Sequence, residues 1–265
     1  MALAGKSQFN RRAGSVREKA YRHIQRSIAD GSLAAGGGIS ELMLAKELKS
    51  SRAPIREAMH QLAAEGLLEQ NPSGGMVVAQ MTRDDILELY ELREALEVFA
   101  VGKIAGAPMN PNEKRRLQQL VDGISVLRRE LQASDRKALN ANQMDRFIAC
   151  DLGFHALLLS TANNSRLLKV VNDTRLLIRI FAIRREGHDR ATLKSIQRYH
   201  QQILDAVAKQ RREEAMAAIA AHIQASRRER LEEYDLSKRE DLLRQTPPLS
   251  TRAKGRSHYE HFRIA

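Results

Sequence analysis

An aspartate and three histidines in the second half of the chain are spaced so that together they could bind a metal ion. Asp151 and His155 are four residues apart, so on a helix the carboxylate and the imidazole share one face. His200 lies 10 residues before Gln210, and His222 lies 12 residues after it. A tight turn at Gln210 would place both about 15 Å along facing helices, because each residue adds 1.5 Å of rise. Three nitrogens and one carboxylate suit zinc, nickel or a similar divalent ion and leave coordination positions open.

The same residues have plainer interpretations, as a surface pair and as histidines packed in a core. His200 and His222 both fall on apolar, inward-facing helix stripes, where an unpaired polar ring is costly, and this favours the metal site. A metal-dependent hydrolase is the alternative function, since the cluster could activate water and His188-Asp189 resembles the dyads of phosphohydrolases. No candidate general base accompanies the four ligands, so we expect the protein not to be an enzyme.

Two arginines near the N-terminus are spaced for reading DNA. Arg52 and Arg56 are four residues apart and share one face at the start of a helix that begins after Ser51. A DNA-reading helix presents such side chains to guanine edges or phosphates at its N-terminal end. A cation in the first turn opposes the helix dipole by up to about 1 kcal/mol, so stability does not explain Arg52. The alternative is a pair of solvated surface arginines with Glu57 nearby.

Short helices and a hairpin surround these arginines. Apolar residues recur every four positions over residues 16–28, Ser40 is a predicted N-cap of a second helix, and the third helix ends at Gly66. The period then changes, and residues 67–70 and 76–79 are predicted strands joined by a cluster of turn formers. We therefore expect a small complete domain.

From residue 81 onward the pattern is helical. Thr82 followed by Asp85 is a capping box, and breaks in the pattern separate six long segments that predict an antiparallel bundle. The predicted fold is therefore mainly α, with an N-terminal winged helix-turn-helix followed by an antiparallel all-α bundle. The predicted segments are a mobile arm at 1–14, a DNA-binding domain at 15–80, a bundle at 81–237 and a basic, poorly ordered tail at 238–265.

Composition limits the class of protein without locating its partner. The chain has 265 residues and a net charge of +12, which suits a polyanionic partner, but the excess is spread evenly along the sequence. One cysteine, Cys150, excludes an internal disulfide, and no run approaches the roughly 18 apolar residues of a membrane span. We expect a soluble, cytoplasmic protein with no membrane partner.

The N-terminal motif resembles that of a known family. Residues 39–59 read ISELMLAKELKSSRAPIREAM and are followed by Leu62, Glu65-Gly66-Leu67 and a GMVV segment. This is similar to the pattern LxExxLAxxLxVSRxPVREAL, then LxxEGL and GxxV, of the GntR family of bacterial transcription regulators. The resemblance implies a winged helix that binds double-stranded operator DNA. The implied DNA contacts are Ser51, Arg52 and Arg56 on the recognition helix and Gly75 in the wing.

The chain departs from this family pattern at four positions. The glycine and valine that are usual in the turn are replaced by Lys49 and Ser50, and the frequent threonine by Ala53. Gly74 stands where a basic residue is common before the wing glycine. These departures bear on operator preference and wing affinity rather than on the fold.

The second half resembles the FCD-type effector domain of the FadR subfamily within the same family. The matching pieces are Glu91-Leu92-Arg93-xx-Leu96-Glu97, Asp151-xxx-Phe154-His155, Tyr199-His200-xx-Ile203-Leu204 and Ala217-xxxx-His222-Ile223. The resemblance implies one divalent metal ion per chain, zinc or nickel, bound by Asp151, His155, His200 and His222. It also implies that a small organic acid binds beside the metal.

Two arginines are candidates for holding the organic acid. Arg175 lies on an otherwise apolar stripe, and a buried guanidinium needs an anion; Arg93 is the second candidate. An internal salt bridge, such as Arg93 with Glu97 one helical turn later, is the alternative. We therefore expect a ligand-responsive transcription regulator that acts as a homodimer, with the dimer contact mainly on the bundle.

Overall fold

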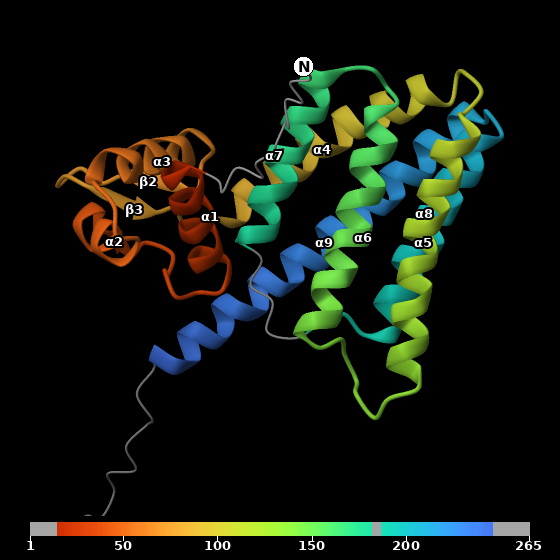
Figure 1. The fold of residues 1–265 in the computed structure, drawn as a ribbon. Coiled ribbons are helices and arrows are strands. Elements are labelled where there is room, and N and C mark those ends of the chain that lie inside the picture. The colour runs from red at the N-terminus through yellow and green to blue at the C-terminus, as the bar shows by residue number, and fades with distance from the viewer. Residues whose placement is uncertain (1–14, 182–186, 246–265) are drawn as a thin grey trace, which may run out of the picture.

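The computed structural model describes residues 15–181 and 187–245. A small N-terminal unit of helices and short strands is followed by a bundle of long helices (Figure 1), and the predicted mainly α fold is confirmed. The elements are α1 (Val16–Ala29), β1 (Gly38–Ile39), α2 (Glu41–Glu47), α3 (Arg52–Ala64), β2 (Leu68–Gln70), β3 (Met76–Val78), α4 (Arg83–Ile104), α5 (Pro111–Gln132), α6 (Ala141–Ser160), α7 (Ser165–Ile180), α8 (Arg190–Ala208) and α9 (Arg212–Gln245). The predicted arm and residues 246–265 lie outside the described residues.

The N-terminal unit is built on α1 and α3, which pack against each other above a three-stranded antiparallel sheet. The strand order is β1-β3-β2, and Ile39 pairs with Met76. The sequence prediction contained β2 and β3 but missed β1, because that strand is only two residues long and follows a run of glycines. The side chain of Ser40 accepts a hydrogen bond from the amide of Met43, so the predicted N-cap of α2 is present.

Two turns in this unit depend on left-handed backbone. Gly74 and Gly75, at the tip between β2 and β3, have φ of 98° and 82°, which glycine adopts without steric cost. Lys49, between α2 and α3, has φ of 49° although it carries a side chain. This conformation costs a non-glycine residue about 1 to 2 kcal/mol. The turn therefore keeps its shape in this chain without the glycine that is usual there.

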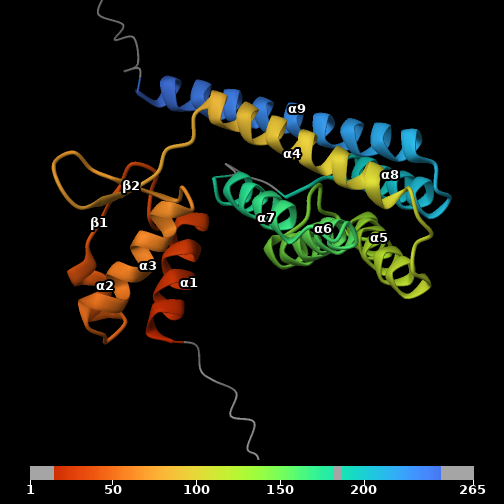
Figure 2. The same ribbon diagram turned by 90° about the horizontal axis from the view of Figure 1, so that it is seen from above.

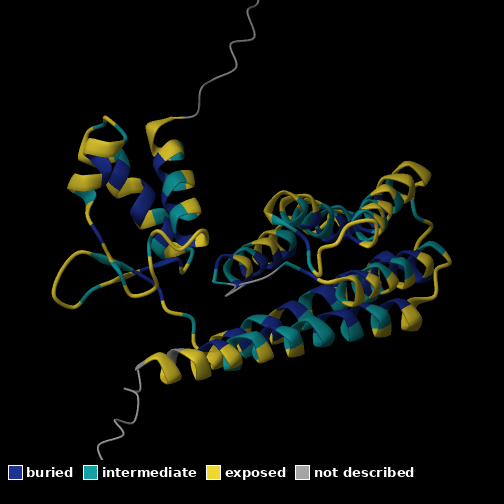
Figure 3. Cartoon of the chain, turned by 90° about the horizontal axis from the view of Figure 1, so that it is seen from below, coloured by how far each residue is buried: buried dark blue, intermediate teal, exposed yellow. Residues whose placement is uncertain are grey.

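The bundle contains six helices among the described residues, and α4 and α9 lie side by side along most of their length (Figure 2). Figure 3 shows their buried residues on the sides that face the other helices, while the outer sides are exposed. Capping residues define the ends: Thr82 and Asp85 form the predicted capping box of α4, and Asn140 and Gln143 form another at α6. No helix in the described part of the chain is long and apolar enough to cross a membrane.

The prediction of a basic, poorly ordered tail from residue 238 was wrong for its first eight residues. Helix α9 continues to Gln245 and is 34 residues long. Residues 238–245 contain no glycine or proline and are mostly good helix formers, and the helix ends two residues before Pro247. Three residues before this segment, Asp235 of α9 pairs with Arg83 in the first turn of α4, at 3.2 Å. Residues 238–245 therefore extend α9 from close to the point where the N-terminal unit joins the bundle.

Helix α7 belongs to both units. Its Ile180 is buried in the core formed by α1, α3 and the sheet, and Leu176, Leu177 and Phe181 pack against that core. Other residues of the same helix, including Val171 and Ile178, belong to the core of the bundle. Figure 1 shows α7 between α1 and the other bundle helices. One helix therefore connects the interior of the bundle with the N-terminal unit by direct side-chain packing.

Candidate functional site

The structure brings the four residues of the predicted metal site together inside the bundle. Asp151 and His155 lie on α6, His200 on α8 and His222 on α9, and one ligand atom from each lies within 4.8 Å of the others. Nε2 of His155 is 3.2 Å from Nε2 of His222, and Nε2 of His200 is 3.4 Å from Oδ1 of Asp151. The turn that aligns α8 with α9 falls at Gln210, as predicted, with φ of 55°. All three histidines are buried.

Glu97 of α4 holds one of these histidines in place. Its Oε2 lies 2.8 Å from Nδ1 of His155, and both side chains are almost fully buried. An ionised carboxylate can only accept, so in neutral His155 the proton sits on Nδ1 and the lone pair of Nε2 faces the cluster. Carboxylates commonly orient metal-binding histidines in this way. Glu97 therefore fixes the tautomer and the orientation that a metal ligand needs.

Two buried arginines complete a charged network around the cluster. Nε of Arg93 lies 3.0 Å from Oε1 of Glu97. Arg175 of α7 contacts Glu97 at 3.4 Å through Nη1 and Oδ2 of Asp151 at 2.8 Å through Nη2. Both arginines proposed as effector contacts thus form the internal salt bridges that were their alternative interpretation. Asp151 uses Oδ2 for Arg175, so its Oδ1 still faces the histidines.

This network sets the protonation of the site. Burial would raise the pKa of Glu97 and of Asp151, but the neighbouring arginines, Arg93 for Glu97 and Arg175 for both, hold each pKa well below its usual range. Burial, together with the charge of Arg175, lowers the pKa of His155 to about 4. Burial and the adjacent histidines lower the pKa of His222 as well. At neutral pH the site therefore offers ionised carboxylates and, at His155 and His222, neutral imidazoles, the forms that bind metal ions.

The cluster fits a divalent cation. Nδ1 of His200 is buried and makes no hydrogen bond to any described residue, and buried Nε2 has only the 3.4 Å contact with Oδ1 of Asp151, which is costly unless another partner is present. The ring of Phe154 stacks on His200 with centroids 4.2 Å apart and fixes its plane. Three imidazoles and one carboxylate are a donor set for zinc or nickel. When bound, such an ion would supply positive charge and open coordination positions for an anion.

Replacing Glu97 by Gln tests its role as the residue that positions His155. We expect metal affinity to fall 10- to 100-fold, the usual effect of losing such a partner, as measured by competition with a chromophoric chelator. Glu94→Gln is the matched control, because Glu94 lies on the same helix and pairs with Gln224 instead. Equal metal affinity in the Glu97→Gln variant and the wild type would show that His155 needs no carboxylate.

Sequence reasoning noted Glu97 as a partner of Arg93 and as part of a family motif, but assigned it no role at the metal site. The signal that could have revealed it is its position on the inward stripe of α4, where a carboxylate is surrounded by buried residues such as Tyr90, Ala100 and Val101. The dyad that suggested a hydrolase lies elsewhere. Asp189 caps α8 through the amide of Thr192. Its neighbour His188 precedes His200 by 12 residues, roughly 18 Å along the chain.

The predicted DNA-reading residues lie at the N-terminal end of α3. Ser51 is the N-cap residue, but its side chain makes no capping hydrogen bond, and no acidic residue lies in the first turn. Arg52 is exposed, and its side chain has no hydrogen bond or ion pair with any described residue. Arg56 forms a bidentate pair with Glu41 of α2, at 3.0 and 2.9 Å, rather than with its sequence neighbour Glu57. Gly75 lies at the tip between β2 and β3.

A helix-turn-helix with a β-hairpin wing, followed by a helical bundle with a buried polar site, defines a DNA-binding transcription regulator with an effector domain. Residues 16–78 match the model of the gntR family of bacterial regulatory proteins, and residues 88–225 match the FCD domain. The chain belongs to the GntR family and carries an FCD domain.

Known relatives agree with this assignment. The chain is 30% identical to the HTH-type transcriptional regulator YdhC of Bacillus subtilis, over 76% of this chain and 85% of the relative. It is 29% identical to the probable D-xylose utilization operon transcriptional repressor of Paenarthrobacter nicotinovorans, over 76% and 83%. The structure of E. coli McbR/YncC has a similar fold, with a TM-score of 0.62, 20% identity and coverage of 83% of this chain and 99% of that chain. The prediction of a transcription regulator rather than an enzyme is confirmed.

Proposed function

We propose that this regulator binds a divalent metal ion at Asp151, His155, His200 and His222, and a small organic acid beside it, and that the acid changes its affinity for operator DNA. The observation that carries the proposal is the charge of the buried network. Ion pairs link Arg93 to Glu97, Glu97 to Arg175 and Arg175 to Asp151, and the charges of these four residues cancel. A divalent ion would therefore add two buried positive charges without a counter-charge, and an anionic ligand would offset them.

The link from the metal site to the DNA-binding unit is α7. Arg175 on this helix contacts Asp151, which is one of the proposed metal ligands. Two and five residues further along α7, Leu177 and Ile180 pack on the N-terminal core. A ligand that changes the Arg175–Asp151 contact would therefore act on the helix that supports the DNA-binding unit. Effector and DNA affinities are then linked, and the linkage must be reciprocal.

The experiment that tests this function measures operator affinity in metal-loaded and metal-free protein. An operator selected from random duplexes with the wild-type protein serves as the probe in fluorescence anisotropy. We expect a di- or tricarboxylate to change the Kd by 5- to 150-fold only when metal is bound, with metal content checked after each titration. The proposal is wrong if organic acids leave the Kd of metal-loaded protein unchanged, or if the active ligand is a cation or an apolar molecule.

We also propose a functional division and assembly for the chain. Residues 15–80 would bind DNA through Ser51, Arg52, Arg56 and Gly75, residues 81–237 would bind the effector and a second subunit, and the protein would act in the cytoplasm, where its operator lies. The support for a homodimer is an apolar face on α4. Phe99 is 60% exposed and Leu92 41%, and they are seven residues apart with exposed Ala95 between them. A second copy that packs on this face would cover all three.

Phe99→Asp is expected to convert the protein from a dimer to a monomer. Loss of a central aromatic contact typically costs about 2 to 4 kcal/mol, or roughly 30- to 1000-fold in dimer affinity. Light scattering at micromolar concentration measures the change, and operator affinity should fall with it because a symmetric operator needs two recognition helices. Val126→Asp on α5 is the control, because Val126 is also exposed but lies on another helix. If the Phe99→Asp protein is still a dimer, the dimer interface does not lie on this face of α4.

A further inference from the structure

A basic cavity of about 510 Å³ lies where α5 ends and α8 begins, apart from the Asp/His cluster. Its lining includes one carboxylate, from Asp189, and five basic side chains: Arg128, Arg136, Lys137, Arg190 and Lys194. None of these five side chains makes a hydrogen bond or ion pair within residues 15–181 and 187–245.

The placement of these cations does not favour the stability of the chain. Arg190 is the first residue of α8, where a positive charge opposes the helix dipole. Lys194 follows one turn later on the same face, and like charges at this spacing repel each other. Two unfavourable placements of positive charge at one cavity point to an anionic ligand.

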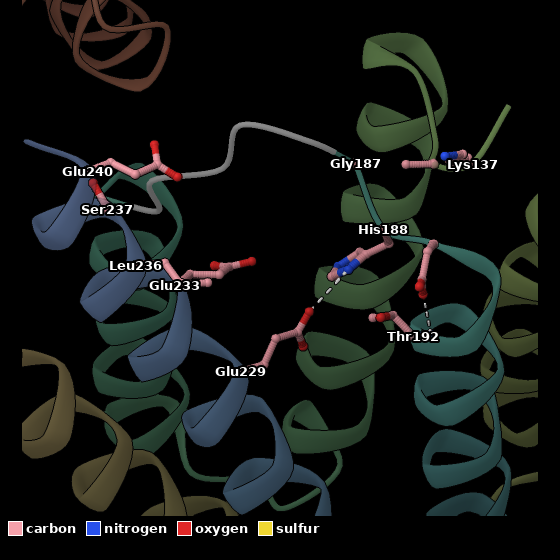
Figure 4. Close-up of a pocket in the computed structure, with 11 residues that line it drawn as sticks. Lys137, Gly187, His188, Thr192, Glu229, Glu233, Leu236, Ser237 and Glu240 are labelled. Carbon is pink, nitrogen blue, oxygen red and sulfur yellow. Dashed lines mark hydrogen bonds and ion pairs between the residues drawn. The ribbon is translucent and has the colours of Figure 1, made fainter. Parts of the chain in front are cut away.

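An adjoining cavity of about 490 Å³ has the opposite character (Figure 4). It shares Lys137 and Asp189 with the basic cavity but is otherwise acidic, with Glu229, Glu233 and Glu240 of α9 in its lining. The acidic groups therefore lie on α9, whereas the five basic groups come from α5, α8 and the connection before α6. Asp189 can offset only one of the five, and its carboxylate is already engaged by the amide of Thr192.

We propose that the basic cavity binds a small phosphorylated molecule with two or more negative charges. Guanidinium groups pair with phosphate oxygens in bidentate fashion, and a concave basic surface concentrates positive potential. The volume is within the range of small-molecule sites. Among the residues that the structure describes, no aromatic side chain lines the cavity, so the phosphate groups rather than a stacked base provide the recognition. The recognition helix α3 lies on the other side of the molecule (Figures 1 and 2), which favours a small molecule over the DNA backbone.

The test uses pyrophosphate as the probe and isothermal titration calorimetry on the full chain at low salt. The variant is Arg190→Gln with Lys194→Gln, and the matched control is Arg115→Gln with Arg116→Gln. The control removes two exposed charges from the opposite end of α5 and so gives the same change in net charge. We expect the variant to bind pyrophosphate at least 10-fold more weakly than the wild type and the control to stay within 2-fold. Any chelation of metal by pyrophosphate is common to all three proteins and cancels in the comparison.

Three outcomes would overturn the proposal. Equal binding by the wild type and the Arg190/Lys194 variant would mean that pyrophosphate binds elsewhere. If pyrophosphate binding is weakened equally in the Arg115/Arg116 control, the binding responds only to the net charge of the protein. Loss of operator affinity in the variant, with no pyrophosphate binding by the wild type, would mean that the cavity contacts the DNA backbone instead. Circular dichroism of the two double variants shows whether each keeps the wild-type helix content.

Discussion

His222→Ala is expected to abolish stoichiometric metal binding and the thermal stabilisation that accompanies it. Free metal at 1000 times its Kd stabilises the folded state by about 4 kcal/mol, which is on the order of 10 °C in Tm for a chain of this size. His222 projects from α9, and its Nε2 lies 3.2 Å from that of His155. Truncation would therefore remove one of the converging nitrogens. Elemental analysis and thermal melts with and without zinc or nickel measure both effects.

His188→Ala is the matched control for this prediction. His188 is also buried, packs edge-on against Phe147 and pairs with Glu229 at 3.4 Å, but it is not part of the cluster. Its loss should lower the Tm of the metal-free protein while leaving the metal-induced rise in Tm intact. If wild-type Tm does not respond to metal, or responds equally in the His222→Ala variant, the buried histidines serve packing alone.

Arg56→Ala is expected to abolish sequence-specific operator binding. A bidentate arginine–base contact contributes about 1 to 3 kcal/mol of discrimination, and Arg56 also carries positive charge toward the phosphates. In the structure its guanidinium is held by Glu41 of α2, which fixes the side chain at the exposed end of the recognition helix. Arg52→Ala should have a smaller effect, about 5- to 150-fold in Kd. Gel shifts with specific and scrambled duplexes measure both.

The ion pair between Arg56 and Glu41 allows a further test of this prediction. If Glu41 only holds Arg56 in position, Glu41→Gln should retain operator specificity, with an affinity equal to or higher than that of the wild type because one negative charge is removed near the DNA. Arg22→Ala is the control, because Arg22 is an exposed arginine of the same domain that pairs with a carboxylate, that of Glu18. Normal, sequence-selective binding by an Arg52→Ala/Arg56→Ala double variant would rule out α3 as the reading helix.

Local spacing was sufficient to predict the helix order and the residues of the cluster. Asp151 and His155 depend only on helical periodicity, and His200 and His222 depend on that periodicity and one turn at Gln210. The partners that hold the site residues in place depend on contacts between helices that are far apart in the sequence. Glu41, the partner of Arg56, is 15 residues away on another helix, and Glu97 reaches His155 across 58 residues. No local pattern contains these pairings.

Two other features escaped sequence reasoning for different physical reasons. Strand β1 is only two residues long, so it has no alternation to detect, and it exists because β3 supplies its hydrogen-bond partners. The end of α9 was predicted as a tail because its composition is polar. Polar residues such as those at 238–245 still have good helix propensity when an existing helix can extend through them.

Because α7 packs in the cores of both the N-terminal unit and the bundle, the two domains of this regulator are not interchangeable modules. A fragment that ends near residue 80 would lack Ile180, which is 5% exposed in the intact chain, and would leave the surface that it covers open to water. A chimera that joins this DNA-binding domain to a bundle from a relative would need matching apolar residues at the end of its own α7. Exchange of domains within the family is thus constrained by a packed helix, and not only by the linker that joins the two parts.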